Sequence, residues 1–107
     1  MKNDSTISVR EIEFRHAINE THDCDTKAIE GIVQIKIPQR NSAPWEGEVH
    51  VFEVSGHRSA TRCYAWAESL GKTAIVIHTV LHSDRISSSE KAVKSVLRRR
   101  GHRRSSL

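Results

Sequence analysis

Three runs of strand-forming residues follow one another in the second half of the sequence, and they restrict the chain to a fold built on a sheet. The runs are Glu46–Val54, Arg62–Glu68 and Thr73–Leu81, of which the last is densest in β-branched residues. Turn-forming residues separate them at Ser55–Ser59 and at Leu70–Lys72. Because strands joined by short turns pair antiparallel, the sequence predicts an antiparallel meander over residues 46–81.

Two more strands are predicted before this meander. In Ile32–Ile37 apolar and polar side chains alternate, and Pro38 ends the pairing because proline has no N–H to donate. Residues 39–44 then form a connecting loop. In residues 9–18 the large apolar side chains occupy even positions, which favours a half-buried strand over a helix. The polar segment 19–27 is rich in turn-forming residues and is predicted to be a loop.

A helix is predicted at residues 88–100. Ser87 and Glu90 have the spacing of a capping box, and Gly101 is a natural end for the helix. The apolar stripe that would pack on the sheet consists of Ala92, Val93, Val96 and Leu97. The predicted fold class is therefore α+β: an antiparallel sheet of four or five strands with one carboxy-terminal helix packed on one face.

The chain of 107 residues is short enough to predict a single domain over residues 1–107. Its ordered part is expected to span about residues 7–100, followed by a flexible basic tail at 101–107. No stretch approaches the roughly 20 apolar residues of a membrane helix. The first six residues lack the parts of a secretory signal. We therefore expect a cytoplasmic protein without a membrane partner.

Basic residues gather near the carboxy terminus. The net charge is +4, yet seven basic residues and one acid follow from Ile86 onward, whereas the first 85 residues carry ten basic and twelve acidic ones. The sequence predicts a site for nucleic acid or an acidic protein, without base readout. The alternative is a solvated helix end whose arginines favour the helix dipole. The predicted binding residues are Lys91, Lys94, Arg98, Arg99, Arg100, Arg103 and Arg104.

A second candidate surface lies on the strand Arg62–Glu68. Arg62, Tyr64 and Trp66 share one face of this strand. Aromatic side chains beside arginine on an open sheet can stack single-stranded nucleic acid. The alternative is that this face lies under the helix, where Tyr64 and Trp66 would belong to the core.

The segment Pro44–Trp66 resembles small uncharacterised bacterial proteins that share the pattern PWEG...VHVF...GH..A.RCYAW, followed by a β-rich run and a short helix. The resemblance covers residues 44–97 and brings no assigned activity with it. If the pattern reflects function, the residues to test are Trp45, His57, Arg62, Tyr64 and Trp66. In the packing alternative, Trp45 and Trp66 are core anchors, and Gly47 and Gly56 are required by turns.

Cysteine and histidine supply an enzymatic alternative. Cys24 and Cys63 are too few for a disulfide framework and are expected to be reduced. Cys63 could pair with His57 as a nucleophile, but it falls on a face of small residues that is typical of packing. His78 and His82 would lie about 13 Å apart on a strand, too far to share one zinc ion. No metal or cofactor is predicted.

These observations favour a small non-enzymatic binding module whose basic helix engages nucleic acid or an acidic partner. One alternative is a protein-interaction or accessory subunit, for example a homodimer through a sheet edge. The other is a small enzyme that uses His57 or Cys63.

Overall fold

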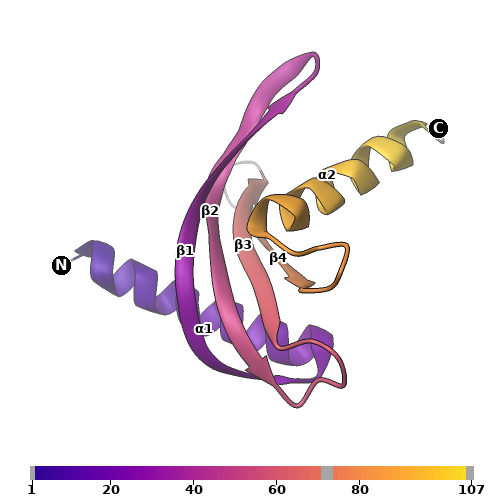
Figure 1. Ribbon diagram of the computed structural model, residues 1–107. Coiled ribbons are helices and arrows are strands. Elements are labelled where there is room, and N and C mark those ends of the chain that lie inside the picture. Colours follow the sequence, from indigo (N-terminus) through magenta and orange to yellow (C-terminus); the bar gives the residue numbers. More distant parts are fainter. Residues whose placement is uncertain (1, 71–73, 106–107) are drawn as a thin grey trace.

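A four-stranded antiparallel sheet lies between two helices in the described part of the chain (Figure 1). The computed structural model describes the backbone of residues 2–70 and 74–105 and the side chains of residues 11–69 and 75–99. The strands are neighbours in chain order, so the α+β class and the antiparallel sheet are confirmed. The elements are α1 (Lys2–His22), β1 (Asp25–Gln39), β2 (Ser42–Ser55), β3 (Arg62–Leu70), β4 (Ala74–Leu81) and α2 (Ser89–Ser105).

The first element is a helix, and the strand predicted at residues 9–18 is wrong. Phe14 and Ile18 lie four residues apart, as one helix face requires, and both are fully buried. Ile12, which a strand would place on the same face as Phe14, is 66% exposed. The helix α1 covers one face of the sheet, so the described residues form three layers and not the two that the sequence predicts.

The loop predicted at residues 19–27 is also wrong, because its turn-forming residues serve as the end of α1. Asp23 adopts a left-handed φ of 54°, and its N–H donates to the carbonyl oxygen of Asn19 at 2.9 Å. The Asn19 amide in turn donates to the carbonyl oxygen of Cys24 at 3.0 Å. β1 therefore begins at Asp25, and two residues separate it from the last helical one, His22.

β1 and β2 form a long hairpin that extends past the rest of the sheet (Figure 1). Pro38 does not end the pairing: β1 continues to Gln39, and a register shift between Ile37 and Gln39 accommodates the proline. The predicted loop 39–44 shrinks to a tight turn at residues 40–41, where Asn41 has a φ of 66°. β2 pairs with β3 only through residues 50–53. Residues 31–49 therefore include a two-stranded arm that reaches beyond β3.

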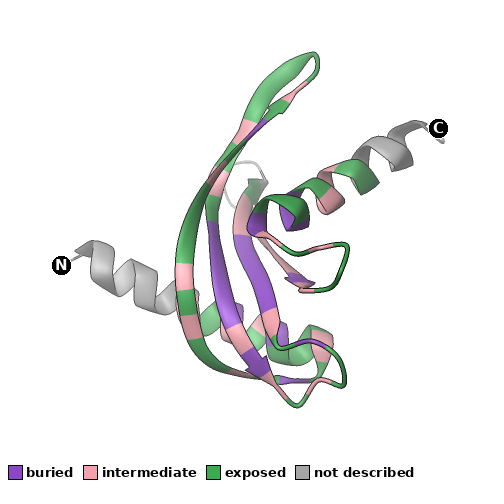
Figure 2. Cartoon of the chain, viewed as in Figure 1, coloured by how far each residue is buried: buried purple, intermediate pink, exposed green. Residues whose placement is uncertain are grey.

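Both faces of the sheet are buried, chiefly over β2 and β3 (Figure 2). Alternate residues of each strand point to opposite helices. The cluster under α2 contains Ile37, Val49, Val51, Tyr64, Trp66, Val80, Ala92 and Val93. The cluster under α1 contains Phe14, Ile18, Cys24, Phe52, Val54, Cys63 and Ala65.

α2 packs on the sheet through the predicted stripe, but both of its ends differ from the prediction. Ser88, and not Ser87, caps the first turn: its hydroxyl accepts the backbone N–H of Lys91 at 3.2 Å. The helix passes Gly101 and continues to Ser105. The turn predicted at residues 70–72 lies largely outside the described residues.

Candidate polyanion-binding site

The outer face of α2 carries a row of cations. Lys91, Lys94 and Arg98 are exposed and lie at spacings of three and four residues, opposite the buried Ala92 and Val93. Lys94 forms an ion pair with Glu90 at 2.8 Å, with both side chains about half exposed. Such an exposed pair within one helix is weak. It leaves Lys94 available to a stronger anion.

A groove on one side of α2 brings a further arginine to this row. Arg85 precedes the helix in a loop held by Ser83 and Ile86, whose backbone groups bond each other at 3.0 and 3.1 Å. The groove has a volume of about 400 Å³, and none of its described lining residues is acidic. The described lining residues are Arg85, Ile86, Lys91, Lys94, Ser95 and Arg98.

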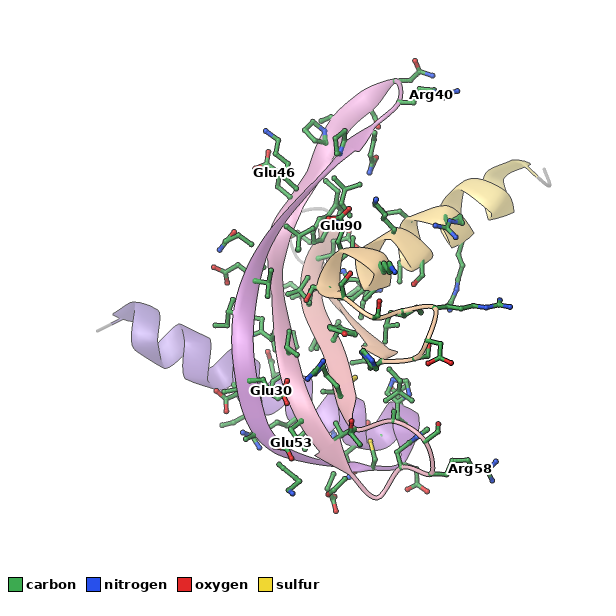
Figure 3. All side chains as sticks on the ribbon, viewed as in Figure 1. Glu30, Arg40, Glu46, Glu53, Arg58 and Glu90 are labelled. Carbon is green, nitrogen blue, oxygen red and sulfur yellow. The ribbon has the colours of Figure 1, made fainter. Side chains whose placement is uncertain are left out.

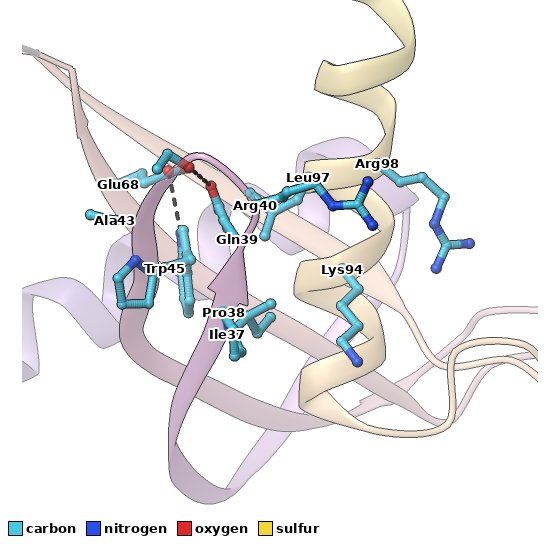
Figure 4. Close-up of a pocket in the computed structure, with 12 residues that line it drawn as sticks. Ile37, Pro38, Gln39, Arg40, Ala43, Trp45, Glu68, Lys94, Leu97 and Arg98 are labelled. Atoms are coloured by element: carbon cyan, nitrogen blue, oxygen red, sulfur yellow. Dashed lines mark hydrogen bonds between the residues drawn. The ribbon is translucent and has the colours of Figure 1, made fainter.

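A larger cleft of about 640 Å³ lies on the other side, between α2 and the β1–β2 arm (Figure 4). Arg40, at the tip of the arm, lines it together with Lys94 and Arg98. Glu68 is the one acidic residue among the described residues that line the cleft, and Glu90, outside the lining, pairs with Lys94. Since Lys94 and Arg98 line both hollows, the cations of three chain segments form one continuous surface. We call it the basic ridge: Arg40, Arg85, Lys91, Lys94 and Arg98.

Trp45 forms part of the wall of the cleft. Its ring is half-buried, and its Nε1–H donates to Oε2 of Glu68 at 3.4 Å. It meets Trp66 edge to face, with ring centroids 6.4 Å apart and planes at 81°. A Cβ on Gly47 would come within 2.8 Å of the indole. Gly47 is therefore not a turn residue but a strand position that leaves room for Trp45.

Glu68 is held in place from both oxygens. Its Oε1 bonds to Nε2 of His78 at 2.8 Å, while Oε2 accepts the indole N–H of Trp45. His78 in turn stacks on Trp66, with ring centroids 5.3 Å apart and planes at 27°. A carboxylate bonded to two ring N–H groups keeps a fixed position. The wall of the cleft therefore includes Trp45 from β2 and Glu68 from β3, and His78 from β4 supports Glu68 from behind the lining.

The five residues marked by the sequence pattern do not come together in one site. Tyr64 and Trp66 are buried beneath α2, as in the packing alternative. Arg62 donates to Glu30 at 2.8 Å on the edge strand β1. His57 organises the β2–β3 loop: its Nδ1 accepts two backbone N–H groups, those of residues 59 and 60. Gly56 in that loop has a φ of 87°, so its predicted turn role is confirmed.

The nucleophile suggested for the enzymatic alternative is inaccessible. Cys63 is fully buried under α1, and burial raises the pKa of its thiol to about 12. Burial also raises the pKa of Cys24. A reactive cysteine needs exposure and a lowered pKa, so neither thiol suits catalysis.

The histidines occupy separate places. His78 bonds to Glu68, and Nδ1 of His82 lies 2.7 Å from the hydroxyl oxygen of Tyr64. Within the described residues, no three His, Cys, Asp or Glu side chains gather as they would to hold a metal ion.

Sequence reasoning found part of the basic ridge and missed two of its members. Lys91, Lys94 and Arg98 are signalled by their helical spacing, and Arg99 is exposed on the same helix. Arg40 and Arg85 are isolated in the sequence and reach the ridge only through the fold. The side chains of Arg100, Arg103 and Arg104 lie outside the described residues.

Neither helix has, over the residues that the structure describes, an apolar stretch long enough to cross a membrane. No family model, curated protein or solved structure matches the chain.

Proposed function

We propose that this protein is a non-enzymatic module that binds the phosphate backbone of nucleic acid along the basic ridge. The observation that carries the proposal is the convergence of Arg40 and Arg85, from two distant loops, on the cation row of α2. A solvated helix end would not require cations from other segments beside it. Several phosphates neutralised together release their counterions, and this release drives binding without base readout.

The electrostatic setting supports an anionic backbone as the ligand. The side chains of the basic ridge are exposed, so their charges remain hydrated in the free protein and are accessible to a ligand. Among the described residues, the groove beside Arg85 contains no acid, and the cleft beside Arg40 contains one. We also place the protein in the cytoplasm, where nucleic acid is accessible. Its two cysteines do not form a disulfide, and reduced thiols are typical of that compartment.

Fluorescence polarisation with a short labelled oligo(dT) tests the proposal. Lys94→Gln/Arg98→Gln removes the two cations that line both hollows. Counterion release alone predicts that each lost phosphate contact lowers affinity roughly tenfold at 50 mM salt. We therefore expect the double variant to bind far more weakly than the wild-type chain.

The matched control is Lys27→Gln/Arg58→Gln. It removes the same charges and also breaks one exposed ion pair, that of Lys27 with Glu53 at 3.5 Å. Arg58 lies at the end of the molecule away from Arg40 (Figure 3). The control should bind as the wild type does. Equal loss in both variants, or no binding by the wild type at low salt, contradicts the proposal.

A second candidate function, a homodimer through β1, is favoured by a separate observation. In the described residues the outer edge of β1 has no partner strand. From Gly31 to Ile37 the pairing with β2 stays in register, so this edge is regular. Ile32 and Val33 are 45% and 40% exposed on its two faces. A regular apolar edge is a template for another strand, and a second copy of β1 would cover both residues.

A further inference from the structure

We infer that the cleft between α2 and the arm holds one base of single-stranded nucleic acid, stacked against Trp45, with the flanking phosphates on Arg40, Lys94 and Arg98. This inference rests on the proposed function and assigns it a ligand class. It begins from the lining of the cleft, which combines an apolar wall with a cationic rim.

The apolar part of the cleft suits a flat, hydrophobic ligand. Ile37 and Pro38 from β1, Trp45 from β2 and Leu97 from α2 line it. Figure 4 shows Trp45 and Glu68 on one side and Lys94, Leu97 and Arg98 on the other. The volume of about 640 Å³ is that of a small-molecule site. A phosphate alone would use the rim and leave this wall without a partner.

Trp45 is held in position before any ligand arrives. Glu68 accepts its N–H at 3.4 Å, and Trp66 meets its ring at 81°. Gly47 provides the space that the ring occupies above the strand. A fixed ring loses little conformational freedom on binding. Base stacking on an aromatic side chain is tolerant of sequence, because every base has a flat π-face.

The charge of the rim explains why the base should come with its backbone. Three cations line the cleft, and Glu68 is the one acidic residue among its described lining residues; its carboxylate already bonds to Trp45 and His78. Glu90, outside the lining, forms only the exposed pair with Lys94. Arg98 and Lys94 continue into the groove beside Arg85, so a strand can run along the ridge from the cleft. A base in a duplex is stacked between its neighbours and must leave the helix to enter a pocket. The cleft therefore favours a single strand.

The test compares oligo(dT) with an abasic oligonucleotide that has the same number of phosphates. Both probes offer the ridge equal charge, but only oligo(dT) offers a base. Stacking of one base on an aromatic ring corresponds to about tenfold in affinity. We expect the wild-type chain to bind oligo(dT) about tenfold more tightly than the abasic strand, and Trp45→Leu to abolish that preference. Trp45→Tyr keeps a ring and should retain most of it.

Each outcome distinguishes the two proposals. If the wild type binds neither probe at low salt, the proposed function fails. If the wild type binds both probes equally, the proposed function is supported and the stacking of a base on Trp45 is refuted. A preference for oligo(dT) that persists in Trp45→Leu refutes the stacking as well. Should Trp45→Leu fail to fold, the tryptophan fluorescence of the wild-type chain is measured with each probe instead. Trp66 is 1% exposed, so quenching by oligo(dT) and not by the abasic strand reports on Trp45, and its absence refutes the inference.

Discussion

At the scale of single residues, Cys63 illustrates how burial sets chemistry in this protein. Its thiol lies in the cluster under α1, where Cys63 pairs with Phe52 of the neighbouring strand and shares a face with Ala65. Burial disfavours the thiolate and raises the pKa of Cys63 from 9.0 to about 12. The folded chain therefore keeps the proton over a range of pH in which the unfolded chain releases it. Folding is stabilised fully below pH 9, and that stabilisation is lost as the pH rises toward 12.

This titration predicts a loss of stability in alkali. At pH 10 the wild-type chain should have lost about 1.4 kcal/mol of unfolding free energy relative to pH 7 through Cys63. Denaturant unfolding of the wild type and of Cys63→Ala at both pH values isolates this contribution. The variant leaves a cavity and is less stable throughout, but its stability should fall less between pH 7 and pH 10. The same fall in both chains would show that Cys63 does not titrate in this range.

At the scale of elements, α1 shows why part of the fold could not be predicted. Its inner face follows helical spacing at positions 11, 14, 15, 18 and 22, but Phe14 and Ile18 are the only large apolar residues of the five. Glu11 and Arg15 pair at 3.0 Å, and Arg15 also lies 5.7 Å from the ring centroid of Phe52. Arg15 and His22 also have partners in distant segments, Phe52 and Thr79, which the local sequence does not show. The apolar stripe of α1 is therefore interrupted in the sequence.

The other elements were predictable because local pattern and packing agree in them. The three runs predicted as strands correspond to β2, β3 and β4. They are rich in strand-forming residues, which suit a sheet that is covered on both faces. The predicted stripe of α2, Ala92, Val93, Val96 and Leu97, packs on the cluster beneath that helix. The same agreement predicted correctly that Tyr64 and Trp66 could be core. Sequence alone did not show that a second helix covers the opposite face.

Two alanine variants test the placement of α1. Phe14→Ala removes a fully buried ring and should lower the free energy of unfolding by about 3 to 5 kcal/mol. Ile12→Ala removes a side chain that is 66% exposed and should change it by less than about 0.5 kcal/mol. Chemical denaturation measures both values. A strand at residues 9–18 would give similar losses for the two variants, and that result would contradict the helix.

At the scale of the whole molecule, the basic ridge depends on how distant segments meet. The spacing of Lys91, Lys94 and Arg98 was sufficient to predict their common face. Arg40 and Arg85 lie in the part of the sequence with more acids than bases, so net charge conceals them. The hairpin arm brings Arg40 to one side of α2, and the loop after β4 brings Arg85 to the other. The charge counted along the sequence thus underestimates the number of cations that gather on the basic ridge.

The second candidate function makes a prediction about assembly. If β1 pairs with a second copy, Val33→Lys should convert a dimer to a monomer, because a charged residue on an edge strand opposes pairing. Ile75→Lys is the control, since Ile75 is 61% exposed on β4, the other edge of the sheet. Light scattering after size exclusion gives the mass. A monomeric wild type, or dissociation by the Ile75 variant alone, contradicts pairing through β1.

The salt dependence of nucleic-acid binding tests the basic ridge most directly. For a single strand, the logarithm of the binding constant falls with the logarithm of salt concentration by about 0.7 per neutralised phosphate. Loss of two contacts in Lys94→Gln/Arg98→Gln should therefore make the slope shallower by about 1.4. The Lys27→Gln/Arg58→Gln control should keep the wild-type slope. Identical slopes for the wild type and the ridge variant would contradict the account.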